Sequence, residues 1–407
     1  MKGSLCSMMD IENNYTPDRH HSNCMKWDGI EHHFGRSDLL PLWVADMDFK
    51  APDEVIEALG RMVKFGVFGY YQVPDSYYES ILRWEKDHHG YGVSKEWIYF
   101  TPGIIPAIHA FVHIKTKPDD ACMIFAPCYR PFIEAAVNTG RKIIAHELIE
   151  KANGQYVIDY KRLEKDIAIN GVKILILGSP HNPTGRVWGA DELEKIIEIC
   201  RRYKVFIISD EVHQDIILDK DKRHIPTASM VDYDDMLVTL ISASKTFNLA
   251  GCQNACAIIP NVELRAQYEA HMKDTRFIRG AMFGYAATEA AFTHGDEWLK
   301  TVLKVIRNNF EYARERFLKE LPKVRISPTE GTYLMWADFG AYVPFVEMKN
   351  VFEEYCRVAV YYGNWFWPDT QHPDTHVRIN LATKIENVID AVDRIIFGIK
   401  RYLQEKQ

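Results

Sequence analysis

Short runs made almost entirely of apolar residues constrain the fold of this chain more than any other feature. Three of them follow one another in the middle of the chain, at residues 174–177, 205–208 and 237–241. A strand with one face in water alternates polar and apolar residues, whereas a strand buried on both faces does not. The runs therefore predict strands in the interior of a largely parallel sheet.

The segments between these runs have the pattern of helices. Residues 191–204 are the clearest case, because Leu193, Ile196, Ile197 and Cys200 fall on one helical face and charged residues fall on the other. Strand and helix in alternation are typical of an α/β layer. We expect residues 51–285 to form a large domain of this kind.

The last third of the chain has a different pattern. A long amphipathic helix is expected at residues 297–321 and another at 386–405, with short strand-like pieces at 333–336 and 377–381 between them. This order predicts a smaller α+β domain over residues 286–407, on which the irregular N-terminal residues 1–50 pack. A length of 407 residues suits two domains at about 150 residues each.

Composition argues against several classes of protein. The chain has 49 Lys and Arg against 56 Asp and Glu, a formal charge of −7, so it offers no basic surface for nucleic acid. No stretch approaches the roughly 18 apolar residues of a membrane span, and residues 1–17 lack the apolar core of a secretory signal. The 8 scattered cysteines fit free thiols in a reducing cytoplasm.

No metal site is expected from the histidines. His109 and His113 have the four-residue spacing of ligands on one helix, but no third ligand accompanies them and their neighbours are apolar. The histidine pairs elsewhere in the chain are interpreted as surface or loop residues.

Residues suited to ligand binding stand next to the predicted strands. The turn of Gly103, Ile104 and Ile105 precedes a helix expected at residues 106–114, and free N–H groups at a helix start bind anions. Asn182 follows the first of the three runs, in a turn rich in Pro and Gly. Ligands of open α/β sheets bind at this edge, so Asn182 is a candidate contact.

Two charged residues follow the next two runs. Asp210 is either a helix N-cap or the partner of a buried cation, and Lys245 is either a surface lysine or, if desolvated, a residue that forms a Schiff base. Because the carboxyl ends of parallel strands meet at one edge of a sheet, we expect Asn182, Asp210 and Lys245 to converge on one crevice.

Together these motifs resemble the fold-type I pyridoxal-phosphate (PLP) enzymes, and more closely the MalY/PatB family of cystathionine β-lyases and cysteine C–S lyases. The resemblance rests on WVADMDF at 43–49, FGY at 68–70, HNPTGRVW at 181–188, DEVH at 210–213 and KTFNLAG at 245–251. It implies a large domain with a mostly parallel central sheet flanked by helices, and a smaller α+β domain.

The resemblance also implies roles for individual residues. Lys245 is expected to bind PLP covalently and to act as the base, and Asp210 to pair with the pyridine nitrogen. Asn182 is expected to bind the ring oxygen and Tyr129 to stack on the ring. Arg378, between two apolar neighbours, is expected to bind the α-carboxylate of the substrate next to Asn182.

The phosphate of PLP is expected to bind backbone N–H groups at a helix start, at Gly103, Ile104 and Ile105. The hydroxyl groups of Ser242 and Ser244, in the turn before Lys245, are expected nearby. Tyr70 would reach the phosphate from a neighbouring subunit. The resemblance therefore implies a homodimer with shared active sites.

Two positions distinguish the chain from typical aminotransferases. His213 stands where those enzymes usually carry Tyr, and it is expected near the cofactor; Gln253 stands where they usually carry a phosphate-binding Arg. Both favour β-elimination from cystathionine, cysteine or another S-substituted cysteine, which yields a thiol, pyruvate and ammonia. A class I/II aminotransferase stays the alternative, and a regulatory role in binding another protein stays open as a side role.

Overall fold

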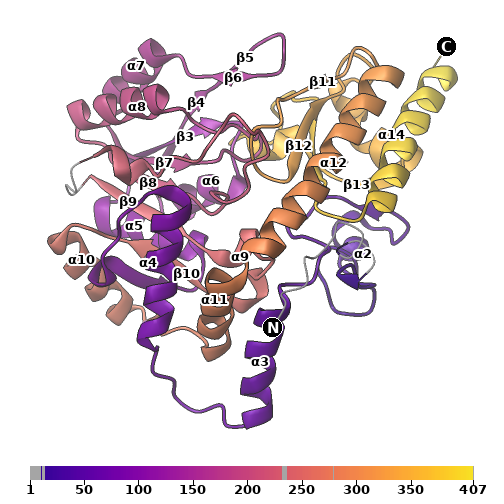
Figure 1. Cartoon of the computed structure of the whole chain (residues 1–407). Coiled ribbons are helices and arrows are strands. Elements are labelled where there is room, and N and C mark those ends of the chain that lie inside the picture. The colour runs from indigo at the N-terminus through magenta and orange to yellow at the C-terminus, as the bar shows by residue number, and fades with distance from the viewer. Residues whose placement is uncertain (1–10, 12–13, 232–235, 278, 407) are drawn as a thin grey trace.

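A seven-stranded sheet forms the centre of the larger part of the molecule (Figure 1). The computed structural model describes residues 11, 14–231, 236–277 and 279–406. In spatial order the strands are β2 (Ile98–Thr101), β10 (Ala255–Ile258), β9 (Leu237–Ile241), β8 (Phe206–Asp210), β7 (Val172–Gly178), β3 (Ala121–Ala126) and β4 (Lys142–Glu147). All run parallel except β10, which is antiparallel to both neighbours. The predicted, largely parallel sheet is confirmed.

Both faces of the sheet are buried, as the apolar runs predict. Ile174 and Ile176 of β7 pack into one cluster, while Leu175 and Leu177 of the same strand pack into the other. Helices α5 (Ile104–Lys115), α6 (Arg130–Val137) and α10 (Val262–Asp274) cover the first face, and α8 (Ala190–Tyr203) packs on the second. The other α-helices with bounds in the described part of the chain are α2 (Ile30–Phe34), α3 (Asp53–Phe65), α4 (Asp75–His89), α7 (Tyr160–Asn170), α9 (Ala243–Thr246), α11 (Met282–His294), α12 (Asp296–Glu320), α13 (Met348–Asn350) and α14 (Ile385–Glu405).

A second, antiparallel sheet belongs to the C-terminal part. Its strands, in spatial order, are β11 (Arg325–Ile326), β12 (Leu334–Asp338), β15 (His376–Asn380) and β14 (Tyr361–Tyr362). Helices α12 and α14 lie side by side next to it, and both were predicted (Figure 1). A further short ribbon pairs β5 (Ile149–Glu150) with β6 (Tyr156–Val157).

The N-terminal segment joins this C-terminal part. Strand β1 (Leu40–Pro41) pairs in parallel with β13 (Val358–Ala359). The N-terminal segment therefore contacts the smaller part at this strand pair, and its assignment to the smaller domain stays a prediction. Residues 1–10, with Cys6, and residues 12–13 lie outside the described residues. The boundaries of the two domains near residues 51 and 285 stay predictions.

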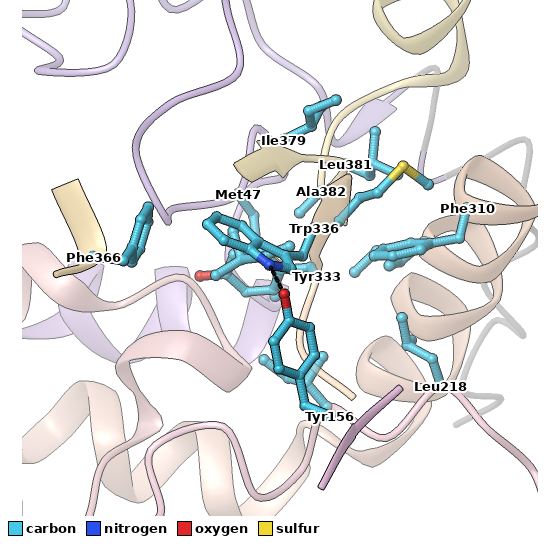
Figure 2. Packing of buried hydrophobic residues seen from close by; sticks show 14 of the residues in the cluster. Met47, Tyr156, Leu218, Phe310, Tyr333, Trp336, Phe366, Ile379, Leu381 and Ala382 are labelled. Atoms are coloured by element: carbon cyan, nitrogen blue, oxygen red, sulfur yellow. Dashed lines mark hydrogen bonds between the residues drawn. The ribbon is translucent and has the colours of Figure 1, made fainter. Parts of the chain in front are cut away.

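One continuous core links the two parts of the molecule. Trp336 of β12 is 1% exposed, and its indole Nε1–H donates a hydrogen bond of 3.0 Å to the hydroxyl of Tyr156 on β6 (Figure 2). Tyr333 and Phe366 belong to the same cluster. This contact joins the β5–β6 ribbon to β12 of the small sheet. No helix of the described ranges is long and apolar enough to span a membrane.

A buried ion pair ties α4 to the segment that follows β8, and it makes stability depend on pH. His89 lies on α4 with a buried side chain, so its interpretation as a surface or loop histidine is wrong. Its Nε2 lies 2.8 Å from Asp215 Oδ1, and Thr246 Oγ1 donates to the other carboxylate oxygen at 2.6 Å. Burial alone would lower the pKa of His89, but the hydrogen bond and charge of Asp215 raise it to about 9. The folded chain therefore holds this proton more tightly than the unfolded chain does.

We expect the free energy of unfolding to fall as pH rises from about 7 through 9, because the stabilisation present below the unfolded pKa of His89 is lost there. Urea titrations at pH 7 and pH 9.5 measure this loss. In the variant His89→Gln, which keeps a donor but cannot be charged, the loss should be smaller than in the wild type. An equal loss in both proteins would contradict the assignment to His89.

Candidate active site

The predicted residues meet in one cavity at the carboxyl ends of β7, β8 and β9. The cavity has a volume of about 230 Å³. Apart from Tyr70 and Arg378, every residue predicted for the site lines it: Gly103, Ile104, Ile105, Tyr129, Asn182, Asp210, His213, Ser242, Ser244 and Lys245. The predicted convergence of Asn182, Asp210 and Lys245 is therefore confirmed.

Strand register brings these residues together. Gly178 at the end of β7 is paired with Asp210 at the end of β8, and Asp210 is paired with Leu240 near the end of β9. The three turns that follow these strands consequently start at the same level of the sheet. Asn182 lies four residues beyond the first pairing, and Lys245 lies on α9 just beyond β9.

Asp210 is a buried carboxylate without a salt bridge among the described residues. Its Oδ1 accepts a hydrogen bond of 3.1 Å from the N–H of Val212, in a turn rather than at the start of a helix. Burial raises the pKa of Asp210 to about 7, and the charge of Lys245 counteracts this only in part. The N-cap interpretation is therefore wrong, and the carboxylate is suited to a cationic partner.

Lys245 is half-buried, so the interpretation as a surface lysine is also wrong. Its Nζ donates a hydrogen bond of 2.7 Å to the carbonyl oxygen of Ala45. Burial lowers the pKa of Lys245 to about 8, although the charge of Asp46 acts in the opposite direction. A substantial fraction of this amine is neutral near physiological pH, as a nucleophile requires.

Arg378 enters the site from β15 of the small sheet and is 2% exposed. Its Nη1 donates to Asn182 Oδ1 and its Nη2 to the carbonyl oxygen of Trp43, both at 3.0 Å. Its Nε–H is buried and has no partner among the described residues. An unpaired buried donor of a guanidinium is suited to an anionic ligand, so the geometry fits a carboxylate here.

His213 is held neutral in the cavity. Burial, together with the positive charges of Lys245 and Arg378, lowers its pKa well below the usual range. Its Nδ1 is buried and has no partner among the described residues. The centroid of the Tyr333 ring lies 5.8 Å from that of His213, and the two rings meet edge to face. A neutral imidazole with an unused nitrogen can bind a polar group of a ligand.

The start of α5 offers backbone donors to an anion. The helix begins at Ile104 after Gly103, two residues earlier than predicted, so Pro106 lies inside the first turn. The first N–H groups of a helix have no acceptor within it. Ser242 and Ser244 line the same cavity, where Ser242 Oγ accepts a hydrogen bond of 3.1 Å from the N–H of Ser244.

Tyr70 is not brought to this cavity within the chain. It lies in the segment after α3, is fully exposed, and lines a different cavity between α3 and α11. Its predicted contribution to a neighbouring subunit stays a prediction.

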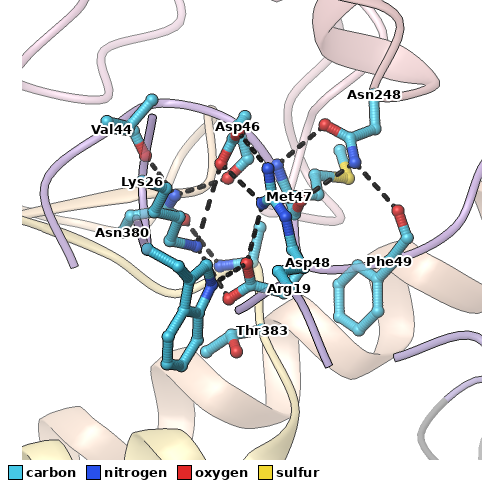
Figure 3. A network of polar contacts seen from close by, with 12 residues as sticks. Arg19, Lys26, Val44, Asp46, Met47, Asp48, Phe49, Asn248, Asn380 and Thr383 are labelled. Carbon is cyan, nitrogen blue, oxygen red and sulfur yellow. Dashed lines mark hydrogen bonds and ion pairs between the residues drawn. The ribbon is translucent and has the colours of Figure 1, made fainter. Parts of the chain in front are cut away.

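The segment of residues 43–49, here called the strap, lies against the site. Its hydrogen bonds to the site residues were not predicted from the sequence. Its Ala45 carbonyl accepts hydrogen bonds from Lys245 and, at 2.8 Å, from the hydroxyl of Tyr333. Asn380 Nδ2 donates to the carbonyls of Val44 and Asp46, both at 2.6 Å (Figure 3). The strap thus joins β15 to the lysine.

Charged residues near the N-terminus hold the strap from its other side. Lys26 is fully buried, and its Nζ lies 2.8 Å from Asp48 Oδ2. Arg19 pairs with Asp46 at 2.8 Å and with Asp48 at 2.9 Å (Figure 3). The strap motif is visible in the sequence. The positions of Asp46 and Asp48 along the chain, however, do not indicate which basic residues pair with them.

The donor set fits PLP. A half-buried amine with a lowered pKa suits covalent attachment, and a buried carboxylate without a counter-ion suits a protonated ring nitrogen. The N–H groups at the start of α5 suit a phosphate. The described residues contain no group of three or more His, Cys, Asp or Glu arranged to hold a metal ion.

Comparisons with known proteins agree with this chemistry. The model of the family "Aminotransferase class I and II" matches residues 37–395. Cystathionine beta-lyase PatB of Bacillus subtilis is 35% identical over 91% of this chain and 95% of its own length. Cystalysin of Treponema denticola, which contains PLP, has a TM-score of 0.89 at 32% identity, over 95% of this chain and 98% of its own.

A PLP-bound protein of Clostridium difficile, described as an aminotransferase, is similar to the same extent. It has a TM-score of 0.91 at 37% identity and covers 95% of this chain and 99% of its own. The family match spans most of the chain, and the resemblance to the MalY/PatB proteins is confirmed. The chain therefore belongs to the class I and II aminotransferase family, within its MalY/PatB group.

Proposed function

We propose that this protein is a PLP-dependent carbon–sulfur β-lyase. It takes an S-substituted L-cysteine and breaks the bond between Cβ and sulfur. With one water the products balance as a thiol, pyruvate and ammonia, without any oxidant or second substrate. The observation that carries the proposal is one cavity that holds Lys245, Asp210 and Asn182, with Arg378 bonded to Asn182. The curated relative PatB bears the name of this activity.

Each of these residues has a distinct task. Bound PLP supplies an electron sink that makes the Cα–H of the amino acid acidic. Arg378 binds the α-carboxylate through its unpaired Nε–H and fixes the orientation of Cα. Lys245, as a neutral amine, removes the proton from Cα at its Nζ. Asp210 holds a proton on the ring nitrogen of the cofactor, and Tyr129 supports the ring face.

Further contacts place the cofactor. Asn182 donates to the ring oxygen, and neutral His213 offers its free nitrogen nearby. The N–H groups of Ile104 and Ile105, after Gly103, bind the phosphate, and Ser242 and Ser244 complete this subsite.

Pyruvate release without a keto acid tests the function directly. The PLP-loaded protein is incubated with L-cystathionine or S-methyl-L-cysteine, and pyruvate is followed continuously. Sustained release over many turnovers is the expected result. An aminotransferase would stop after one turnover and resume only when a keto acid is added, and that result would overturn the proposal.

We also propose that the enzyme is a homodimer that works in a reducing cytoplasm. Apolar side chains gather around the end of α3 and the segment after it, and Phe65 is 75% exposed there beside fully exposed Tyr70. Such a patch is typical of a subunit interface. All the cysteines among the described residues are free, which suits a reducing compartment.

Subunit complementation tests the shared site. We expect Tyr70→Ala and Lys245→Ala homodimers to have low activity and their refolded mixture to recover about a quarter of wild-type activity, because hybrid dimers hold one intact site. Mixing Lys245→Ala with the double variant Tyr70→Ala/Lys245→Ala is the control and should recover nothing. No recovery in the first mixture would place Tyr70 outside the partner's site.

A further inference from the structure

A second cavity adjoins the cofactor cavity and has no role in the steps described above. Its volume is about 450 Å³. Tyr129 lines both cavities, and Arg378 lines the second while its guanidinium is bonded to Asn182 of the first. A substrate whose carboxylate is bound by Arg378 therefore lies at the junction, and its sulfur substituent has the second cavity next to it.

The walls of the second cavity are aromatic. The aromatic residues are Tyr129 from the large sheet side and Tyr361, Trp365 and Phe366 from the small part, and Pro131 and Thr370 also line the cavity. The rings of Tyr361 and Trp365 meet edge to face with centroids 4.8 Å apart. The guanidinium carbon of Arg378 lies 4.8 Å from the centroid of the Tyr361 ring.

These walls are held in place by the backbone. The N–H of Cys128 donates a hydrogen bond of 2.9 Å to the carbonyl oxygen of Phe366, so the turn before Tyr129 is fastened to the segment that carries Trp365. A pocket whose walls are fixed before binding loses little entropy when it takes a rigid ligand.

The charged side chains other than Arg378 belong to the rim. Arg130 Nε lies 3.2 Å from Glu134 Oε1, one turn later on α6, and the two side chains are 39% and 46% exposed. Since each neutralises the other, the rim offers no unpaired charge. A substituent with its own ammonium and carboxylate, as in cystathionine, would have to replace this pair and would lose hydration along the aromatic walls.

We propose that the second cavity holds the sulfur substituent and that the enzyme prefers cysteine conjugates in which this substituent carries an aromatic ring. The proposal rests on the proposed β-lyase function and names its substrate class. Aromatic rings prefer edge-to-face or offset contact with other rings, and Tyr361 and Trp365 present such surfaces. Elimination from such a conjugate releases an aromatic thiol, with pyruvate and ammonia as before.

Relative rates on three substrates test the preference. In the wild type we expect kcat/KM for S-benzyl-L-cysteine to exceed that for S-methyl-L-cysteine by at least about tenfold, because a single methylene in an apolar pocket already changes this ratio by about 10- to 200-fold. We also expect S-benzyl-L-cysteine to exceed L-cystathionine. Equal or reversed ratios would overturn the proposal.

Variants assign the preference to this cavity. Trp365→Ala should lower the benzyl-to-methyl ratio of kcat/KM by about fivefold or more, and Trp365→Phe should keep most of the ratio. Trp367→Ala is the matched control, because Trp367 donates to Asp374 and lines a different cavity. A ratio that survives Trp365→Ala, or that falls equally in Trp367→Ala, would overturn the proposal.

The outcomes separate this proposal from the function on which it rests. Pyruvate from S-methyl-L-cysteine without a benzyl preference would overturn the aromatic pocket and leave the β-lyase intact. No pyruvate from any of the three substrates would overturn both. A preference for cystathionine that is lost in Arg130→Gln would assign the rim pair to a zwitterionic substituent and overturn the aromatic class.

Discussion

Replacement of Lys245 by alanine should abolish turnover. The variant loses both the covalent attachment point and the base for Cα, and general-base catalysis alone contributes about 10²–10⁴-fold. We expect pyruvate release to fall by at least about 10⁴-fold, since the two losses act on the same reaction. The absorbance of covalently held PLP should disappear with it.

Lys245→Arg separates the chemistry of the amine from its charge. Arginine keeps a cation near Asp210 and Arg378, but it stays protonated at all accessible pH values and cannot attach PLP covalently. We expect it to fold like the wild type in thermal unfolding and to be as inactive as the alanine variant. Activity retained in either variant would contradict the assigned role of Lys245.

The rate at which the cofactor-free protein takes up PLP should rise with pH. Only the neutral amine attaches PLP, and burial lowers the pKa of Lys245 to about 8. The neutral fraction therefore grows as pH passes from 7 to 9, and the uptake rate should be half-maximal near pH 8. Stopped-flow absorbance measures it. A rate independent of pH over this range would show that the amine is not the titrating group.

Local patterns were sufficient to predict the large sheet and the residues at its edge. The apolar runs at residues 174–177, 205–208 and 237–241 correspond to β7, β8 and β9. They contain no polar alternation, which indicates that both faces of each strand are buried. Parallel strands place their carboxyl ends at one edge, so Asn182, Asp210 and Lys245 could be grouped without any knowledge of long-range contacts. The helices predicted at residues 106–114, 191–204, 297–321 and 386–405 begin and end within about two residues of those observed, because amphipathic periodicity is also a local pattern.

Contacts between distant segments could not be predicted in this way. Nothing in the sequence indicates that Lys26 pairs with Asp48, or that Asn380 binds the strap at Val44. These pairings depend on how β15 and the N-terminal segment pack against the large sheet. The second aromatic cavity has the same origin, because its walls come from Tyr129 and the start of α6, from β14 and the segment after it, and from β15.

The buried pair of Lys26 and Asp48 should be the most sensitive point of the strap. Asp48→Asn preserves the shape and a hydrogen-bonding group beside Trp27 but leaves the ammonium of a fully buried lysine 4.0 Å from its nearest remaining carboxylate, Asp46. Removing one partner of a buried ion pair costs about 3–5 kcal/mol. We expect the free energy of unfolding, from urea titration with an unchanged slope, to fall by that amount.

A surface pair provides the control for this prediction. Asp38 lies in ion pairs with Arg36 and Arg357, but its side chain is 48% exposed, so Asp38→Asn should cost no more than about 1 kcal/mol. Equal losses in the two variants would show that burial of Lys26 does not matter.

Because Ala45 and Asp48 belong to one strap, Asp48→Asn should also loosen the hydrogen bond from Lys245 to Ala45 and lower kcat, whereas Asp38→Asn should leave kcat unchanged. Stability and turnover are thus coupled through seven consecutive residues, 43–49, which contact the N-terminal segment on one side and the lysine on the other.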